Sequence, residues 1–171
     1  MQADEARALR QATLCLLLRG EPPAEVLLGY KKVGFGQGRY TGFGGKLEAG
    51  EILAQAAQRE MLEESGVSVA LADLDYAAQL DFIFPFRPGW SQSVHVFLAR
   101  AWSGEPQESD EMRPRWFEVA QIPYDQMWAD GRHWLPPLLA GRRIWGRFVF
   151  EQDNQGLAEV EIQDRSPYDR G

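Results

Sequence analysis

Residues 45–67 read GKLEAGEILAQAAQREMLEESGV, and they carry the strongest structural signal in the chain. Residues 51–65 are rich in Ala, Glu, Gln, Leu and Met, residue types that favour a helix. Glu51 opens this helix, and Gly66 follows it at a C-cap position. At about 100° per residue, the apolar side chains fall on one side of the helix, which should pack on a sheet. These side chains are Leu53, Ala56, Ala57 and Met61.

Three glutamates, Glu60, Glu63 and Glu64, lie on or beside this apolar side, because spacings of three and four residues bring helical side chains together. A solvated acidic face is the ordinary interpretation of a Glu-rich helix. Here, however, the like charges repel, and partly buried carboxylates are costly unless positive charge neutralises them. A hard divalent cation such as Mg²⁺, which prefers oxygen ligands, would meet that need and bridge substrate phosphates. Arg59 can orient one carboxylate by a charge-assisted hydrogen bond.

The segment resembles the Nudix signature: a glycine, five residues, a glutamate, seven residues, then Arg-Glu-hydrophobic-any-Glu-Glu-any-Gly-hydrophobic. Every specified position is filled. The matching residues are Gly45, Glu51, Arg59, Glu60, Met61, Glu63, Glu64, Gly66 and Val67. A match at so many fixed positions across a loop and a helix is a strong motif, unlike a lone glycine-rich loop.

The Nudix resemblance implies an α/β (α+β) fold, a three-layer α/β/α sandwich with a mixed β-sheet. It implies that Glu60, Glu63 and Glu64 bind Mg²⁺ or Mn²⁺, helped by the Gly44 carbonyl. Water would attack a phosphorus of a diphosphate, with a carboxylate as general base and no covalent enzyme intermediate. Glu63 and Glu64 are both candidates for that base, and Arg59 and Glu60 complete the expected catalytic group.

Length and composition predict one domain. With 171 residues, 44% of them hydrophobic, the chain can bury a core without disulfides or structural metals. We expect a flexible N-terminal segment at residues 1–12, a single domain at 13–163, and a flexible tail at 164–171. Cys15 is the one cysteine and lies in an apolar run, so a buried, inert thiol in a reducing cytoplasm is expected.

Charge and hydropathy exclude two classes of partner. No stretch approaches the about 20 apolar residues of a membrane span, and the N-terminus lacks a signal-peptide pattern. A formal charge of −7 disfavours binding to a nucleic-acid polymer, since that affinity comes mostly from Lys and Arg. We therefore expect a cytoplasmic protein that handles phosphates through a cation. The resemblance suggests a monomer.

The rest of the pattern mixes strands and helices without regular alternation, which favours a mixed sheet with helices on its faces. Strands are expected at residues 13–18, 26–31, 76–84, 94–101, 115–119, 145–150 and 157–162, and helical stretches at 124–128 and 133–140. The first strand is apolar enough to be central, and the turn at residues 19–23 should join it to the second in a hairpin.

Over residues 13–162 the chain also resembles the animal-type MutT homologues, the oxidised purine nucleoside triphosphatases. The segments that match are Lys31-Lys32, Gly34-Phe35-Gly36, residues 42–46, residues 94–97, residues 108–114, residues 121–123, Met127-Trp128 and Trp134. The resemblance implies hydrolysis of a damaged purine triphosphate to monophosphate and pyrophosphate. It also implies that Glu111 is a further metal-site carboxylate.

In that family, the loop equivalent to residues 127–134 closes over the purine. Trp128 would stack on the base, and Asp130 would hydrogen-bond its edge. Stacking is worth about 1–3 kcal/mol but selects poorly, so a polar group must discriminate. The other expected pocket residues are Thr13, Lys31, Phe35, Thr41, Phe82, Phe84 and Trp134. Core packing is the competing interpretation for Phe82 and Phe84, whereas Trp128 lies in a polar stretch that favours an exposed indole and a binding surface.

Two positions depart from the family pattern. Thr41 stands where the family has an asparagine that hydrogen-bonds the purine edge, and Gly131 stands where it has a second aspartate after the one matched by Asp130. The family's acceptance of both oxidised guanine and oxidised adenine therefore does not carry over directly. The segment Phe84–Trp90 is also longer than its family equivalent. His95 and His133 fall in no metal-ligand pattern and receive no chemistry.

Two other functions remain open at this point. One is a Nudix hydrolase for a different diphosphate, such as an undamaged or methylated nucleoside triphosphate or ADP-ribose. The other is a non-catalytic nucleotide sensor, against which the intact glutamates argue.

Overall fold

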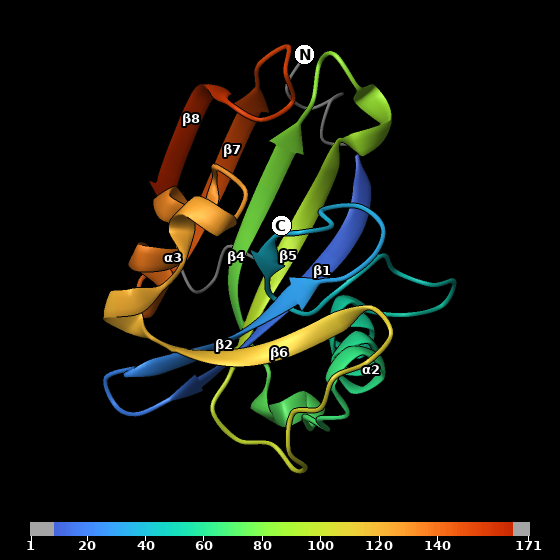
Figure 1. Ribbon diagram of the computed structural model, residues 1–171, viewed down its shortest axis with the longest axis vertical. Helices are drawn as coiled ribbons and strands as arrows, with labels where there is room; N and C mark the ends of the chain where they lie inside the picture. The colour runs from blue at the N-terminus through green and yellow to red at the C-terminus, as the bar shows by residue number, and fades with distance from the viewer. Residues whose placement is uncertain (1–8, 166–171) are drawn as a thin grey trace.

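The computed structural model describes residues 9–165 and shows a mixed β-sheet with a helix on each face (Figure 1). The strands are β1 (Arg10–Arg19), β2 (Glu25–Lys31), β3 (Tyr40–Thr41), β4 (Asp75–Ile83), β5 (Gln92–Ala99), β6 (Met112–Glu118), β7 (Ile144–Phe150) and β8 (Leu157–Asp164). The helices are α2 (Leu53–Ser65) and α3 (Gly131–Leu139). Short 3₁₀ helices span Leu71–Asp73, Pro88–Trp90, Val119–Gln121 and Tyr124–Gln126.

The sheet order is β3-β2-β1-β5-β4-β7-β8, and β6 also pairs with β2. β1 is central, as its apolar sequence predicts: it runs parallel to β5 along most of its length and pairs with β2 only near the turn, at Leu18 and Arg19. β4 joins β5 in antiparallel and β7 in parallel pairing. The sheet is therefore mixed, and strands far apart in the sequence meet at its centre.

Alternate side chains of β1 face opposite layers. Leu16 and Leu18 belong to the core under α3, whereas Cys15 and Leu17 pack with Met61 of α2. The Cys15 thiol is fully buried, and burial raises its pKa to about 12, so it stays protonated at neutral pH. The two helices thus cover opposite faces of one sheet.

Helix α2 begins at Leu53, two residues later than the sequence suggests. The N-cap is Ile52, whose N–H donates to Gln55 Oε1 at 3.0 Å. The helix ends at Gly66, which has φ of +76°, a left-handed conformation that glycine adopts without steric cost. Ala56, Ala57 and Met61 are buried as predicted, and Glu64 and Ser65 are buried with them.

Several expected boundaries are wrong by a few residues. The predicted helix at 124–128 is only the 3₁₀ turn Tyr124–Gln126, because the chain becomes extended at Met127 (φ −114°, ψ 170°). β6 begins at Met112 rather than Arg115, since it pairs with β2 as far as Lys31. Residues 10–12, expected in the flexible segment, form the start of β1.

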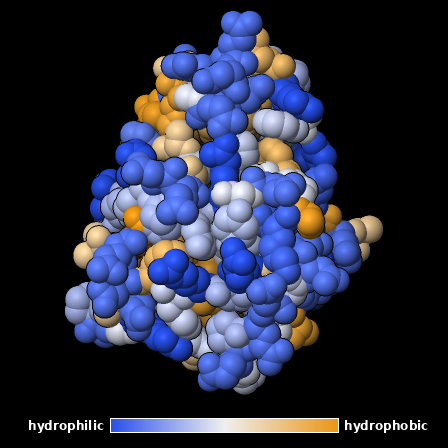
Figure 2. All heavy atoms as spheres, viewed as in Figure 1, coloured by the Kyte–Doolittle hydropathy of each residue, from blue (hydrophilic) through white to orange (hydrophobic). Residues whose placement is uncertain are grey.

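The ends of the chain beyond residues 9–165, where most of the expected N-terminal segment and tail fall, lie outside the described residues. Among the helices that are described, none has the length and apolar character to cross a bilayer. The face of the molecule in Figure 2 is largely hydrophilic, with hydrophobic residues in small separate areas.

Candidate active site

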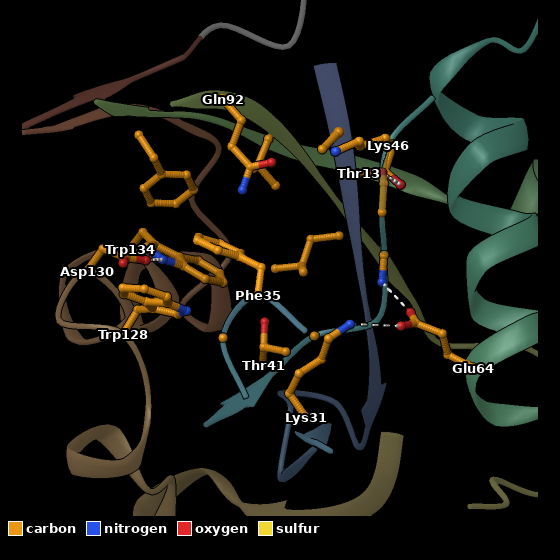
Figure 3. Close-up of a pocket in the computed structure, with 18 of the residues that line it drawn as sticks. Thr13, Lys31, Phe35, Thr41, Lys46, Glu64, Gln92, Trp128, Asp130 and Trp134 are labelled. Atoms are coloured by element: carbon orange, nitrogen blue, oxygen red, sulfur yellow. Dashed lines mark hydrogen bonds and ion pairs between the residues drawn. The ribbon is translucent and has the colours of Figure 1, made fainter. Parts of the chain in front are cut away.

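A cavity of about 300 Å³ runs from the acidic helix α2 to an aromatic wall beside α3 (Figure 3). All of the base-pocket residues expected from the sequence line it: Thr13, Lys31, Phe35, Thr41, Phe82, Phe84, Trp128, Asp130 and Trp134. Gly44 and Glu64 line its other end. The structure therefore brings the expected base pocket and part of the Nudix motif into one space, while the binding roles of these residues stay predictions.

Glu64 is the buried carboxylate of the motif, with only 3% of its surface exposed. Its Oε1 accepts a hydrogen bond of 2.8 Å from Gly44 N, and its Oε2 lies 3.9 Å from Lys31 Nζ. Burial raises the pKa of Glu64 to about 8, and the carboxylates of Glu60 and Glu111 add to that effect. Lys31 and the Gly44 N–H act in the opposite direction.

The position of Gly44 depends on close contact between two backbones. A Cβ at this position would lie 1.8 Å from Thr13 O, so only glycine fits. The main chain on either side of Gly44 is hydrogen-bonded to β1. Thr13 N donates to Gly45 O at 2.8 Å, and Cys15 N donates to Phe43 O at 2.6 Å. This close contact between the two backbones directs the Gly44 N–H toward Glu64.

Arg59 organises the other carboxylates. Its guanidinium donates to Glu51 through Nε (2.7 Å) and Nη2 (2.9 Å), and its Nη1 donates to Glu60 (2.8 Å) and Glu63 (3.4 Å). Glu63 is more exposed than the others, with 57% of its side chain accessible. The predicted orienting role of Arg59 is thus matched by its contacts, and Glu51 is its principal partner.

The expected convergence of three carboxylates is only partial. Glu60 and Glu63 contact Arg59, whereas Glu64 contacts Gly44 and Lys31. Within the described part of the chain, no three acidic, histidine or cysteine side chains are placed to hold a cation as they stand. The N–H of Gly44 faces Glu64, and the metal-binding role expected of the Gly44 carbonyl stays a prediction.

A fourth carboxylate approaches from the loop before β6. Glu111 Oε2 lies 3.7 Å from Lys31 Nζ, so Lys31 stands between Glu111 and Glu64. Glu111 is half-exposed and does not line the cavity itself. Lys31 therefore supplies positive charge where the two carboxylates approach each other.

The aromatic wall is more enclosed than the sequence suggests. Trp128, expected to be exposed, is half-buried: Phe35 stacks on it at 5.2 Å with an interplanar angle of 22°, and Arg39 lies 4.2 Å from its ring on a cation–π contact. Phe84 is buried and stacks on Phe150 at 4.2 Å, so it serves the core and lines the cavity at once. Phe84 is therefore a core residue, as one interpretation predicts, and its contact with a base stays a prediction.

Asp130 is buried in the wall beside Trp134, whose Nε1 donates a 2.7 Å hydrogen bond to Asp130 Oδ2. Burial raises the pKa of Asp130 to about 6, against the opposing effects of the Trp134 hydrogen bond and the Arg39 charge. The carboxyl group can thus exchange a proton close to neutral pH.

Sequence reasoning missed part of the lining. The additional residues are Ala12, Leu14, Gly36, Gly42, Gly45, Lys46, Gln92, Val94, Met112 and Phe150. Period-2 alternation points Gln92 and Val94 of β5 to the same face, a signal that could have identified them. Met112 and Phe150 come from strands whose pairing partners the sequence does not reveal.

The two histidines stay outside the cavity. His95 is buried on the other face of the sheet, between the Tyr76 hydroxyl (2.7 Å) and Gln11 Oε1 (2.6 Å), and burial lowers its pKa to about 4. His133 is exposed on α3. Neither histidine lines the cavity.

Comparison with known proteins shows which family has a similar sequence. The NUDIX domain matches residues 8–138. The chain is 46% identical over 139 residues to a zebrafish (Danio rerio) protein named oxidized purine nucleoside triphosphate hydrolase, covering 81% of this chain and 85% of the relative. It is 44% identical over 155 residues to the mouse (Mus musculus) protein of the same name, covering 91% and 95%.

Solved structures give the same architecture. A mutator MutT protein from Bacillus halodurans matches with a TM-score of 0.74 at 23% identity, over 90% of this chain and 97% of that one. A MutT NUDIX hydrolase from Burkholderia pseudomallei matches with a TM-score of 0.59 at 27% identity, over 67% and 86%. The first likeness, at its low identity, shows the fold alone.

Proposed function

The chain belongs to the NUDIX family, and we propose that it hydrolyses oxidised purine nucleoside triphosphates, 8-oxo-dGTP first among them, to the monophosphate and pyrophosphate. Removal of these nucleotides would keep damaged bases out of newly made DNA. The observation that carries the proposal is the single cavity that joins Glu64 of the Nudix motif to an aromatic wall with a buried acid, Asp130. In the proposed complex the phosphates would lie at α2 and the base at the wall.

The acidic end suits a divalent cation, and we assign it to Mg²⁺, with Mn²⁺ as a substitute. Glu60, Glu63, Glu64 and Glu111, with the Gly44 carbonyl, would hold it. The fit rests on Glu64, a buried carboxylate that lines the cavity and offers it oxygen ligands. Burial disfavours the charged form of Glu64 even with Lys31 nearby, and a hard cation bound by oxygen atoms would stabilise that form. When bound, the cation neutralises phosphate charge and lowers the pKa of water.

The protein residues do the rest of the chemistry. Glu63 or Glu64 accepts the proton of the water that attacks phosphorus, and the pyrophosphate leaves as the P–O bond breaks. Arg59 holds the carboxylates of Glu60 and Glu63 in place by its hydrogen bonds. Lys31, 3.9 Å from Glu64, adds positive charge beside the phosphates.

At the other end, Phe35 and Trp128 would contact the base with their aromatic rings, and Asp130 would offer a carboxyl group to its edge. Thr13, Thr41, Phe82, Phe84 and Trp134 complete the pocket. Oxidation adds an oxygen and an N–H to a purine, and polar contacts at the edge discriminate far better than stacking.

We further propose a single domain, whose first described strand begins at Arg10 and whose last ends at Asp164, a monomer, and a cytoplasmic location without partners among membranes or nucleic-acid polymers. The buried lone thiol supports a reducing compartment.

A competition assay tests the substrate. The protein is incubated with Mg²⁺ and equimolar 8-oxo-dGTP, 2-oxo-dATP, dGTP, dATP and ADP-ribose, and each product is quantified by chromatography. We expect an oxidised purine triphosphate to disappear at least about tenfold faster than dGTP, a difference of about 1.4 kcal/mol in transition-state binding. Faster loss of ADP-ribose or of an undamaged nucleotide would keep the Nudix chemistry and reject this substrate.

The same assay separates an enzyme from a sensor. Glu63→Gln and Glu64→Gln should each lower kcat by about 10²–10⁴-fold, the usual contribution of a general base or of a group that serves the metal. Glu25→Gln, on β2 and away from the cavity, is the matched control. Unchanged turnover in both motif variants would exclude the proposed reaction.

A further inference from the structure

Gln92 is the first residue of β5, and strand pairing places it in the cavity. It lies opposite Phe82 in the antiparallel β4–β5 pair, so the two side chains are neighbours on one face of the sheet. Val94, two residues on, lies on the same face, and all three line the cavity. Figure 3 shows the Gln92 amide entering the cavity from the side opposite Thr41.

The amide of Gln92 has no hydrogen-bonding partner among residues 9–165, although it is half-buried. Its neighbours on the other face of the sheet are paired: Ser93 Oγ donates to Asp81 at 2.6 Å, and His95 contacts both Tyr76 and Gln11. Within the cavity, Asp130 is bonded to Trp134. Gln92 therefore offers two donors and one acceptor to whatever fills the space.

A ligand that fills the cavity removes water from this amide. Burying an amide that gains no new partner in place of water is unfavourable, so an apolar wall would favour Met or Leu here. Glutamine is suited to a ligand whose edge is polar. The proposed purine has such an edge. The other polar groups that could contact it are the Asp130 carboxyl group and the Thr13 and Thr41 hydroxyl groups, whereas Gly131 carries no side chain.

We propose that Gln92 is a specificity-determining residue whose side-chain amide hydrogen-bonds a polar group of the bound base. This assignment rests on the proposed function, since it requires a nucleotide base at the aromatic wall. An amide both donates and accepts, so it can pair with a carbonyl oxygen or an amino group. Gln92 thereby supplies contacts that Thr41 and Gly131 do not.

The test uses Gln92→Met, which keeps the side-chain length and removes both hydrogen-bonding functions. Gln163→Met is the matched control, because Gln163 lies exposed on β8 outside the cavity. Calorimetry of the full chain measures binding of four ligands: 8-oxo-dGMP, 2-oxo-dAMP, the 5′-monophosphate of indole deoxyriboside, and 2-deoxyribose 5-phosphate. The indole ligand stacks but presents no hydrogen-bonding edge.

We expect Gln92→Met to weaken binding of at least one oxidised purine monophosphate by about 3- to 10-fold, and to change binding of the indole ligand by less than about twofold. Gln163→Met should change neither. Equal weakening of purine and indole ligands, or no weakening, overturns the assignment of Gln92 and leaves the proposed function intact. If the unmodified protein binds the oxidised purines no better than 2-deoxyribose 5-phosphate, the base pocket itself is wrong and both proposals fall.

Discussion

The indole Nε1–H of Trp134 donates a 2.7 Å hydrogen bond to Asp130 Oδ2, and both side chains are buried. Burial nevertheless dominates and raises the pKa of Asp130 to about 6 from its ordinary value of 3.8. The folded protein therefore holds this proton more tightly than the unfolded chain does. The resulting stability is complete below pH 3.8 and is lost as the pH rises to about 6.

Asp130→Asn should remove this pH dependence. Between pH 7 and pH 4, the unmodified protein should gain about 2–3 kcal/mol in free energy of unfolding relative to the variant, because the shift spans about two pKa units. Urea denaturation at both pH values measures the difference. A constant difference across that range would show that Asp130 does not titrate in the folded state as its burial implies.

Trp134→Phe should raise the pKa of Asp130 above about 6, since the donor that favours the charged carboxylate is lost while the burial remains. The titration midpoint of the ¹³C-labelled Asp130 carboxyl group, followed by NMR, reports it. Trp102→Phe is the matched control, because Trp102 stacks on Trp116 in the other core. A midpoint that stays in place or falls in Trp134→Phe contradicts the assignment.

Trp128→Ala should weaken binding of a purine monophosphate by about 1–3 kcal/mol, the usual worth of a base stacked on an aromatic ring. Binding of 2-deoxyribose 5-phosphate should hardly change. Calorimetry with both ligands separates loss of stacking from a general defect. Equal losses for the two ligands would mean that Trp128 only supports the fold, through its contacts with Phe35 and Phe84.

Arg59→Lys should lower the melting temperature by about 3–8 °C, because an ammonium group cannot replace the two-pronged contact with Glu51 while also reaching Glu60. Arg132→Lys supplies the control: its partner Asp125 is almost fully exposed, and such surface pairs add little. Differential scanning calorimetry compares the two. Similar melting temperatures for both variants would show that Arg59 does not stabilise the fold through its contacts with Glu51 and Glu60.

Gly44→Ala should destabilise the protein by at least about 3 kcal/mol or prevent folding, because its Cβ would overlap the Thr13 carbonyl and neither backbone can move away freely. Gly89→Ala should cost less than about 0.5 kcal/mol, since no atom lies within 4 Å of a Cβ there. Chemical denaturation of both variants is the measurement. A mild effect of Gly44→Ala would show that the backbones at Gly44 and Thr13 are less closely packed than described.

Residues 45–67 allowed the most to be predicted. Their spacing indicates the helix, its buried face and its Gly66 terminus, all local properties of the chain. The same stretch carries the family resemblance that implies the sandwich, which the sheet and its two helices confirm. The pocket residues, which were taken from the second resemblance over residues 13–162, also meet in one cavity.

Features that depend on contacts distant in sequence were missed. Gln92 enters the cavity because β5 lies between β1 and β4, and the sequence pattern does not state that order. Trp128 is half-buried because the loop carrying Phe35 folds over it. Arg59 separates Glu60 and Glu63 from Glu64, an outcome that helical spacing alone could not give, since all three face nearly one direction.

The fully buried thiol of Cys15 bears on the conditions under which the protein works. Peroxides react with thiolates that solvent can reach, and a thiol with a pKa of about 12 inside the sheet is neither ionised nor accessible. The chain has no other cysteine. Oxidative stress would produce the proposed substrates of the enzyme. The same oxidants could not inactivate the enzyme through a reactive thiol, because its one cysteine is buried and protonated.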